Sequence, residues 1–216
     1  MTAPPARRAI LCPLEFEARA LRKARLADPV RVCGPGEAAV ENAVREVVQE
    51  LAPAKLILAG LAGGLQPDIQ SGQAHWITRV VAAKGDLIAD SPAEQMVDGL
   101  SICTVQAPAE TPEAKQAIHL ASGADLVDME SQRFVEVCEE LGVPWAILRG
   151  VSDQSSEPLP PGTIDLVDAK GRPRKVRTLA FLARNPWRIP GLMKLAGRSS
   201  RAMKQVAAEL SLNSDQ

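Results

Sequence analysis

The stretch AKLILAGLAGG, residues 54–64, decides the fold class of this chain. Apart from Lys55, residues 54–59 are apolar, as is typical of a strand in a sheet that is covered on both faces. Residues 60–64 are rich in glycine, and we interpret them as a turn where a ligand can approach the backbone closely. A tight turn without a ligand would use glycines equally well, so this segment alone leaves both interpretations open.

Helical and strand patterns alternate on both sides of this stretch. Apolar residues recur at helical spacing in one stripe before it: Val40, Val44, Val47, Val48 and Leu51. Further helices are predicted over residues 15–26 and from Asp128 onward. Further strands are predicted at 9–12, 30–33, 74–82, 100–105, 125–127 and 144–151. The alternation predicts an α/β fold, a three-layer α/β/α sandwich with a central mixed sheet, followed by a C-terminal basic helical extension.

Composition disfavours several classes of protein. The chain has 216 residues, of which 46% are hydrophobic and 24% charged, and this suits an ordinary globular core. It contains no apolar run long enough for a transmembrane helix, and its N-terminus is not a convincing signal peptide. Four scattered cysteines indicate a reduced, cytoplasmic protein. With only two histidines and no G-x-S-x-G motif, we expect neither a metal site nor a serine hydrolase.

Charge is distributed unevenly along the chain. Residues 170–208 hold eleven Lys or Arg and no Asp or Glu. We therefore divide the chain into a main domain, residues 1–165, and the basic extension, residues 166–216. The extension is either a solvated helical face packed on the domain or, through residues 170–204, a peripheral contact with the inner face of an anionic membrane. The second interpretation rests on apolar side chains that alternate with basic ones: Phe181, Leu182, Trp187, Ile189, Leu192, Met193 and Leu195, with Arg184, Arg188, Lys194 and Arg198. The sequence contains no nucleic-acid-binding motif.

Candidate site residues follow the predicted strands, because ligands of α/β domains bind beyond the carboxyl ends of strands. An aspartate in a closed pocket, such as Asp153, can donate a proton, although an Asx turn would also explain it. Glu130 can accept two hydrogen bonds from a vicinal diol, whereas helix capping would explain Asp128 without Glu130. Residues 34–39 match a short G-x-G-x-x-A pattern. The acidic residue of a dinucleotide site is missing after the next strand. We therefore interpret Gly36 as part of a turn whose backbone amides lie near an anion or a hydroxyl group.

Five stretches occur together in a known order: 12–18, 34–39, 60–65, 127–131 and 149–153. In this respect the chain resembles the nucleoside phosphorylase family, which includes purine nucleoside phosphorylases and methylthioadenosine/adenosylhomocysteine nucleosidases. The resemblance is closest to the branch associated with hopanoid synthesis. Asp153 followed by Leu-Pro-Pro at 159–161 suggests this branch, as does a basic extension with Gly-Arg-Pro at 171–173 and Pro-Gly-Leu at 190–192.

The resemblance implies a role for each candidate residue. Asp153 would protonate N7 of a purine, and Glu17 would position or deprotonate the attacking water. Glu130 would bind the ribose hydroxyls, with Met129 beneath the sugar. The remaining substrate-binding residues would be Gly60, Leu61, Ala62 and Gly63 near the sugar and nucleophile, together with Ser152 and Gly36.

The resemblance also implies an activity, the cleavage of the N-glycosidic bond of a purine nucleoside by the main domain. The hopanoid branch implies release of adenine from adenosylhopane, a lipid-linked nucleoside, to give ribosylhopane. Hydrolysis is favoured over phosphorolysis because Glu17 is present and no set of arginines for phosphate is evident. We expect no cofactor, with phosphate open as a co-substrate, and a homo-oligomer. Two alternatives stay open. The substrate could be a smaller nucleoside such as methylthioadenosine or futalosine, or the protein could be a nucleotide-binding module without catalysis. The segment 106–112 holds no aromatic residue to stack on the base.

Overall fold

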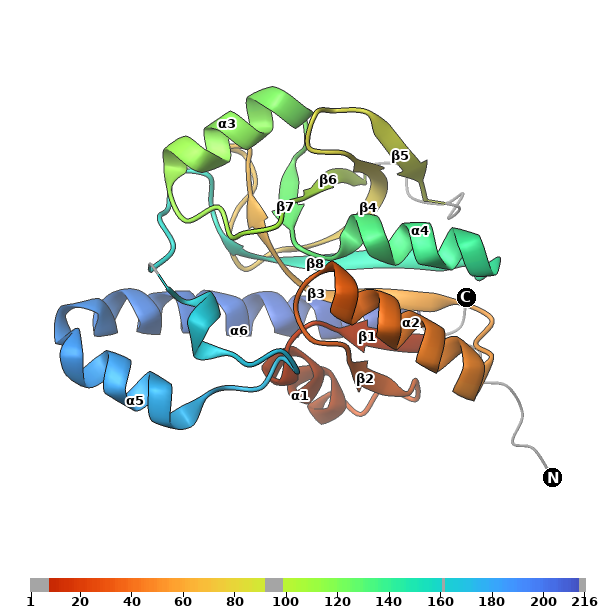
Figure 1. Cartoon of the computed structure of the whole chain (residues 1–216), viewed down its shortest axis with the longest axis horizontal. Helices are drawn as coiled ribbons and strands as arrows, with labels where there is room; N and C mark the ends of the chain where they lie inside the picture. The colour runs from red at the N-terminus through yellow and green to blue at the C-terminus, as the bar shows by residue number, and fades with distance from the viewer. Residues whose placement is uncertain (1–7, 92–98, 161, 214–216) are drawn as a thin grey trace.

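The structure, a computed structural model, describes residues 8–91, 99–160 and 162–213. Eight strands of these residues form one mixed sheet with helices on both sides (Figure 1), which confirms the predicted fold class. The strands are β1 (Ala9–Cys12), β2 (Val30–Val32), β3 (Leu56–Gly64), β4 (Ala74–Val81), β5 (Leu87–Asp90), β6 (Leu100–Thr104), β7 (Leu126–Asp128) and β8 (Trp145–Asp153). The α-helices are α1 (Glu15–Lys23), α2 (Glu37–Leu51), α3 (Pro112–Ser122), α4 (Ser131–Leu141), α5 (Lys175–Arg184) and α6 (Ile189–Leu212), with short 3-10 turns η1 (Ile164–Leu166) and η2 (Pro186–Arg188).

The sheet is open at one side and curled at the other. Its strand order is β2-β1-β3-β7-β6-β4-β5, and β8 pairs with both β3 and β4. β8 is parallel to β3 and antiparallel to β4, while β7 runs antiparallel to the end of β3. The pairings from β3 through β8, β4, β6 and β7 back to β3 therefore close a circuit. This curl brings the ends of β3, β7 and β8 together.

Strand β3 anchors the cores on both faces of the sheet. Successive side chains of a strand point to opposite faces. Leu56 and Leu58 accordingly pack in the core with α2 and α4, and Ile57 and Ala59 pack in the core with α1 and α6. None of the four is more than 1% exposed. Since burying one Leu or Ile side chain contributes about 1.5–3 kcal/mol, this strand holds both helical layers on the sheet.

The glycine-rich segment is not the turn that was predicted. β3 continues through Gly64 and pairs with β8 along its length. At Gly60 a Cβ atom would lie 2.9 Å from Nη1 of Arg149 and 3.0 Å from Oε1 of Glu17. Glycine in a strand often marks such a close approach. The segment therefore lets two buried charged side chains reach the backbone of a continuing strand.

Asp128 does not open a helix, contrary to the prediction. It is the last residue of β7, and α4 begins at Ser131. Oδ1 of Asp128 accepts hydrogen bonds from the backbone N–H groups of Ser131 (3.1 Å) and Glu130 (3.3 Å). Asp128, at the end of β7, thus satisfies free N–H groups at the start of α4, because its carboxylate accepts hydrogen bonds as the side chain of a helix cap does.

Other boundaries also differ from the predicted ones. The first helix ends at Lys23 rather than at residue 26, and β8 extends two residues further, to Asp153. Strand β5 and helix α3 were not predicted. Helix α3 carries an N-terminal signal, since Oγ1 of Thr111 accepts from the N–H of Ala114 (3.2 Å) and Pro112 occupies the first turn.

Helix α6 lies on the same face of the sheet as α1. Its second half buries Met203, Val206 and Leu210 in the core that includes β1, β3 and β8. Pro190 and Gly191 lie in the first turn of α6, where proline is tolerated. The first half of α6 and α5 project together from one end of the sheet (Figure 1, left). Among the described residues, no helix combines the length and apolar character needed to cross a bilayer.

Candidate active site

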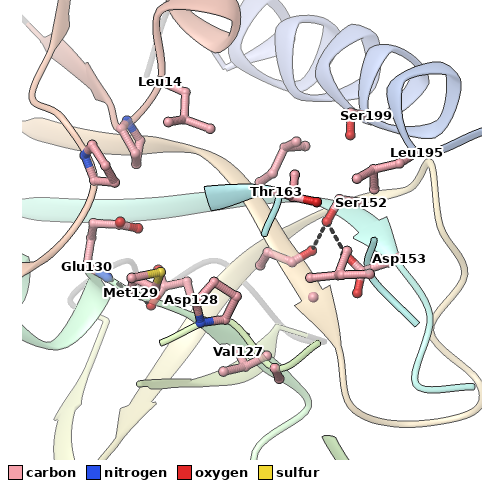
Figure 2. A pocket seen from close by; sticks show the side chains of 18 of the residues that line it. Leu14, Val127, Asp128, Met129, Glu130, Ser152, Asp153, Thr163, Leu195 and Ser199 are labelled. Atoms are coloured by element: carbon pink, nitrogen blue, oxygen red, sulfur yellow. Dashed lines mark hydrogen bonds between the residues drawn. The ribbon is translucent and has the colours of Figure 1, made fainter. Parts of the chain in front are cut away.

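A cavity of about 240 Å³ opens beside the ends of β3, β7 and β8. In Figure 2, Met129 and Glu130 lie on one side of the view and Ser152 and Asp153 lie on the other, and Leu195 of α6 also lines the cavity. Eight of the predicted site residues line it: Glu17, Leu61, Ala62, Gly63, Met129, Glu130, Ser152 and Asp153. The other two, Gly36 and Gly60, lie behind this lining and contact Glu130 and Glu17 respectively.

Glu17 is a buried carboxyl group held between a helix and a strand. Its Oε2 accepts from the N–H of Leu14 (2.8 Å) at the start of α1, and its Oε1 accepts from the N–H of Leu61 (2.9 Å) in β3. Only 1% of the residue is exposed. Burial raises the pKa of Glu17 to about 8, although Arg149 and these two N–H groups act against the rise. A group with this pKa can take up or release a proton near neutral pH.

Glu130 reaches across to the turn before α2. Its Oε1 accepts from the N–H of Gly36 (2.9 Å), and Gly36 adopts φ 90°, a conformation that favours glycine. The side chain of Glu130 makes no cap hydrogen bond to α4, so it is Asp128 and not Glu130 that caps the helix. Burial, with the charge of Asp128, raises the pKa of Glu130 to about 7.

Arg149 lies beneath the carboxyl groups and is fully buried. Its Nη2 donates to Oδ2 of Asp128 and lies 3.6 Å from Oε2 of Glu130. Its Nη1 and Oε1 of Glu17 both lie beside the backbone of Gly60. Within the described residues, Nε and Nη1 of Arg149 have no hydrogen-bond partner. A buried donor without a partner is costly, and Arg149 is not among the described residues that line the cavity.

Asp153 ends β8 on the other wall of the cavity and is 2% exposed. Its Oδ1 accepts from the hydroxyl of Ser152, and its Oδ2 accepts from Nζ of Lys115. These bonds come from side chains, so the described structure does not support the alternative of an Asx turn. Burial raises the pKa of Asp153, and the charge of Lys115 opposes the rise. The lining of the cavity includes Val105 and Pro108, which lie in or next to the segment 106–112 that holds no aromatic residue.

Lys115 and Arg149 are two site residues for which the sequence suggested no role. Lys115 comes from the unpredicted helix α3, so its position near Asp153 could not be inferred. Its spacing to Ile118 and Ser122 does place a lysine on the inner face of a helix, which was a usable signal. Arg149 stands alone within a buried apolar strand, and such a residue needs an acidic partner.

A second hollow, of about 930 Å³, lies between α1 and α6 and adjoins the cavity. The two share four lining residues: Phe16, Thr163, Leu195 and Ser199. Apolar and small side chains of α6 form much of its wall, including Leu192, Ala196 and Met203. A ligand bound in the cavity can therefore extend along an apolar groove.

The family comparison supports a relation to nucleoside-cleaving enzymes. Residues 80–179 match the model of the family described as the Phosphorylase superfamily. No curated protein sequence is significantly similar to the chain.

Solved structures share the fold at low sequence identity. Futalosine hydrolase of Helicobacter pylori strain 26695 aligns with a TM-score of 0.64 and 17% identity over 95% of this chain and 98% of that one. A putative 5′-methylthioadenosine/S-adenosylhomocysteine nucleosidase from Francisella philomiragia gives 0.65 and 18% over 97% and 98%. The 5′-methylthioadenosine/S-adenosylhomocysteine nucleosidase of Helicobacter pylori gives 0.62 and 16% over 96% and 100%.

The family model covers less than half of the chain, and the solved structures share its fold. They relate this chain to the nucleosidases and nucleoside phosphorylases of the phosphorylase superfamily. Enzymes of this kind hydrolyse or phosphorolyse N-glycosidic bonds. The prediction of an enzyme of this class is therefore confirmed, whereas the individual residue roles and the hopanoid branch remain predictions.

Proposed function

We propose that the protein is a nucleosidase that hydrolyses the N-glycosidic bond of a purine nucleoside. One observation carries this proposal: three buried carboxyl groups, those of Glu17, Glu130 and Asp153, surround one cavity with different partners. Glycoside cleavage needs one group that gives a proton to the leaving group and another that activates water on the far side of the sugar. Environments that differ in this way allow carboxyl groups to take different roles.

Asp153 acts at the base. Burial favours its protonated form. In that form it donates its proton to N7 of the purine as the bond to the ribose breaks, and the bonding electrons leave with the base. The ribose then carries oxocarbenium-like positive charge, which the carboxyl groups of the opposite wall can stabilise.

Glu130 and Glu17 act at the sugar. Glu130, fixed by Gly36, accepts hydrogen bonds from the ribose hydroxyls, and Met129 packs beneath the ring. Glu17, which lines the cavity, takes a proton from the attacking water as the oxygen of that water bonds to the anomeric carbon of the ribose. The proton given to the base and the proton taken from water balance.

Water is favoured over phosphate as the acceptor. The only arginine in this cluster of described residues, Arg149, already faces the carboxyl groups of Asp128, Glu130 and Glu17. A phosphate dianion placed here would meet one guanidinium whose charge is already balanced by the carboxylate of Asp128. Hydrolysis without a cofactor or metal therefore fits this cluster better than phosphorolysis.

For the substrate, we propose adenosylhopane, with adenine and ribosylhopane as products. The apolar groove between α1 and α6 supports a large apolar 5′ substituent, because it adjoins the cavity and shares four lining residues with it. Burying such a substituent would contribute about 25 cal/mol for each Å² of apolar surface. Methylthioadenosine and futalosine are the smaller alternatives, and the names of the structural relatives favour these two.

We also propose peripheral contact with an anionic membrane from the cytoplasmic side. Apolar side chains are exposed on α5, η2 and the start of α6: Val176 (83%), Leu179 (68%), Trp187 (71%) and Met193 (70%). Basic residues flank them, including Arg184, Arg188 and Lys194. A surface with both features suits the interface of an anionic leaflet. A homo-oligomer also remains part of the proposal.

The test is base release in phosphate-free buffer from adenosylhopane in vesicles, methylthioadenosine and futalosine, each repeated with added phosphate. Release from adenosylhopane without phosphate is the expected result. Strict dependence on phosphate would reject hydrolysis, and release only from the small nucleosides would reject the hopanoid substrate. No release from any of them, with binding intact, would favour a non-catalytic nucleoside-binding protein.

A further inference from the structure

Lys115 is a lysine with no exposed side-chain surface in the wall of the cavity. Its Nζ donates to Oδ2 of Asp153, to the carbonyl oxygen of Gln154 (2.6 Å) and to that of Glu157 (2.7 Å). An ammonium group has three hydrogens to donate, so these three acceptors satisfy it. Burial of an unpaired ammonium is costly, and the complete set of acceptors explains how the charged form persists here.

Asp153 is the carboxyl partner of Lys115, because the other nearby carboxyl group, that of Glu157, has different partners. The carboxyl group of Glu157 is engaged elsewhere, since Oε1 pairs with Arg198 of α6 and Oε2 accepts from the N–H of Gln154 (3.2 Å). On its other side, Asp153 receives the hydroxyl of Ser152. Lys115 on α3 and Arg198 on α6 are thus the cations near Asp153 and Glu157 among the described residues, each with its own carboxylate.

We propose that Lys115 is a positioning residue that acts through Asp153. Its ammonium group holds Oδ2 and thereby fixes the plane of the carboxyl group at the end of β8. It also balances the negative charge that Asp153 acquires once its proton has passed to the leaving base. This inference rests on the proposed function, because it assigns that proton transfer to Asp153.

The proposal predicts a change in pH dependence that a merely structural lysine would not produce. Base release requires protonated Asp153, so the rate falls as the pH rises through the pKa of this group. A nearby positive charge favours the ionised form, typically by about 1–3 pKa units. Replacing Lys115 by the uncharged Met should therefore move the alkaline limb of kcat/KM by about 1–3 pH units toward higher pH. The rate on the plateau should also fall, by at least about tenfold, because the carboxylate formed is no longer balanced.

Two variants serve as controls. Lys115→Arg keeps the positive charge and should keep the alkaline limb close to that of the wild type. Lys84→Met removes the same net charge from an exposed turn and should leave the profile unchanged. A folded Lys115→Met variant whose limb coincides with that of the wild type, whatever its rate, would overturn the proposal.

A stability measurement covers the case in which Lys115→Met does not fold. Adding Asp153→Asn removes the carboxylate that the lysine balances, so the double variant should fold and resist urea better than the single Met variant. If the double variant is as unstable as the single one, Lys115 serves the carbonyl groups of Gln154 and Glu157 instead, and the proposal fails. This comparison needs no substrate. Absence of base release by the wild type would thus reject the proposed function separately.

Discussion

The backbone N–H of Leu61 in β3 donates a 2.9 Å hydrogen bond to Oε1 of Glu17 in the first turn of α1. The bond joins two segments 44 residues apart in the chain. It fixes one carboxyl oxygen on the strand, and both residues line the cavity. A buried carboxyl group held in this way keeps its orientation without the substrate, which is the preorganisation that general base catalysis requires.

Glu17→Gln should lower the rate of base release about 10²–10⁴-fold, because an amide cannot take a proton from water. Nucleoside binding should change little, since the amide has nearly the same shape. Release rates and equilibrium binding of a nucleoside test the two statements separately. In the wild type, kcat/KM should rise toward pH 8, where Glu17 ionises, and the residual activity of the variant should lack this acidic limb. A variant that retains the limb would exclude Glu17 as the base.

The pKa shifts of Glu17 and Glu130 also predict how stability depends on pH. Both values are raised, from 4.5 to about 8 and about 7, so the folded protein binds protons that the unfolded chain has released. This contribution is present below about pH 4.5 and is lost as the pH rises through the folded-state values. The Glu17→Gln variant should therefore lose less stability than the wild type between pH 5 and pH 9 in urea unfolding. Equal losses would contradict the assigned shift.

Gly60→Ala should damage the site although it adds only one methyl group. The new Cβ would lie 2.9 Å from Nη1 of Arg149, which must move away from Glu17. We expect the rate of base release to fall at least about tenfold, since misplacement of about 1 Å can cost a hundredfold. Gly197→Ala in α6 is the matched control, because a Cβ there meets nothing within 4 Å. Alanine should stabilise that helix by up to about 1 kcal/mol and leave the activity intact. Full activity of Gly60→Ala would show that Arg149 and Glu17 need not lie so close.

Exchanging Trp187 and Met193 for Ser should weaken binding to anionic vesicles. Both side chains are exposed on the projecting part of the chain beside basic residues. Sedimentation with anionic vesicles, at low and high salt, measures the effect, and zwitterionic vesicles should bind the wild type less. Leu120→Ser on α3, which removes a similarly exposed apolar side chain elsewhere, is the control. Wild-type protein that stays in the supernatant with anionic vesicles would end the membrane proposal.

The fold class could be predicted because it depends on periodicity. The apolar run at 54–59 and the stripe from Val40 to Leu51 correspond to β3 and α2 in the structure. The glycine-rich segment was interpreted incorrectly because a strand that carries glycines for close approach looks like a turn in sequence. A glycine is needed at position 60 because the side chain of Arg149 lies close to its backbone. Arg149 is 89 positions further along the chain, and only the β3–β8 pairing brings the two residues together.

The acidic residues of the candidate site could be predicted from the sequence, but its basic residues could not. Glu17, Glu130 and Asp153 follow or precede recognisable elements, so their convergence could be expected. The partner of Asp153, Lys115, comes from a helix that was overlooked, and its contact depends on how α3 packs beside the end of β8. A long-range ion pair of this kind has no local signature in a single sequence.

The most direct test of the account is adenine release by Asp153→Asn, measured by chromatography in phosphate-free buffer beside the wild type and with binding of the same nucleoside as a check of the fold. We expect the wild type to release adenine and the variant to bind the nucleoside but to release adenine at least about 10²-fold more slowly, because the amide has no acidic proton to give. An unchanged rate in a folded variant would remove Asp153 from the reaction and contradict the central claim.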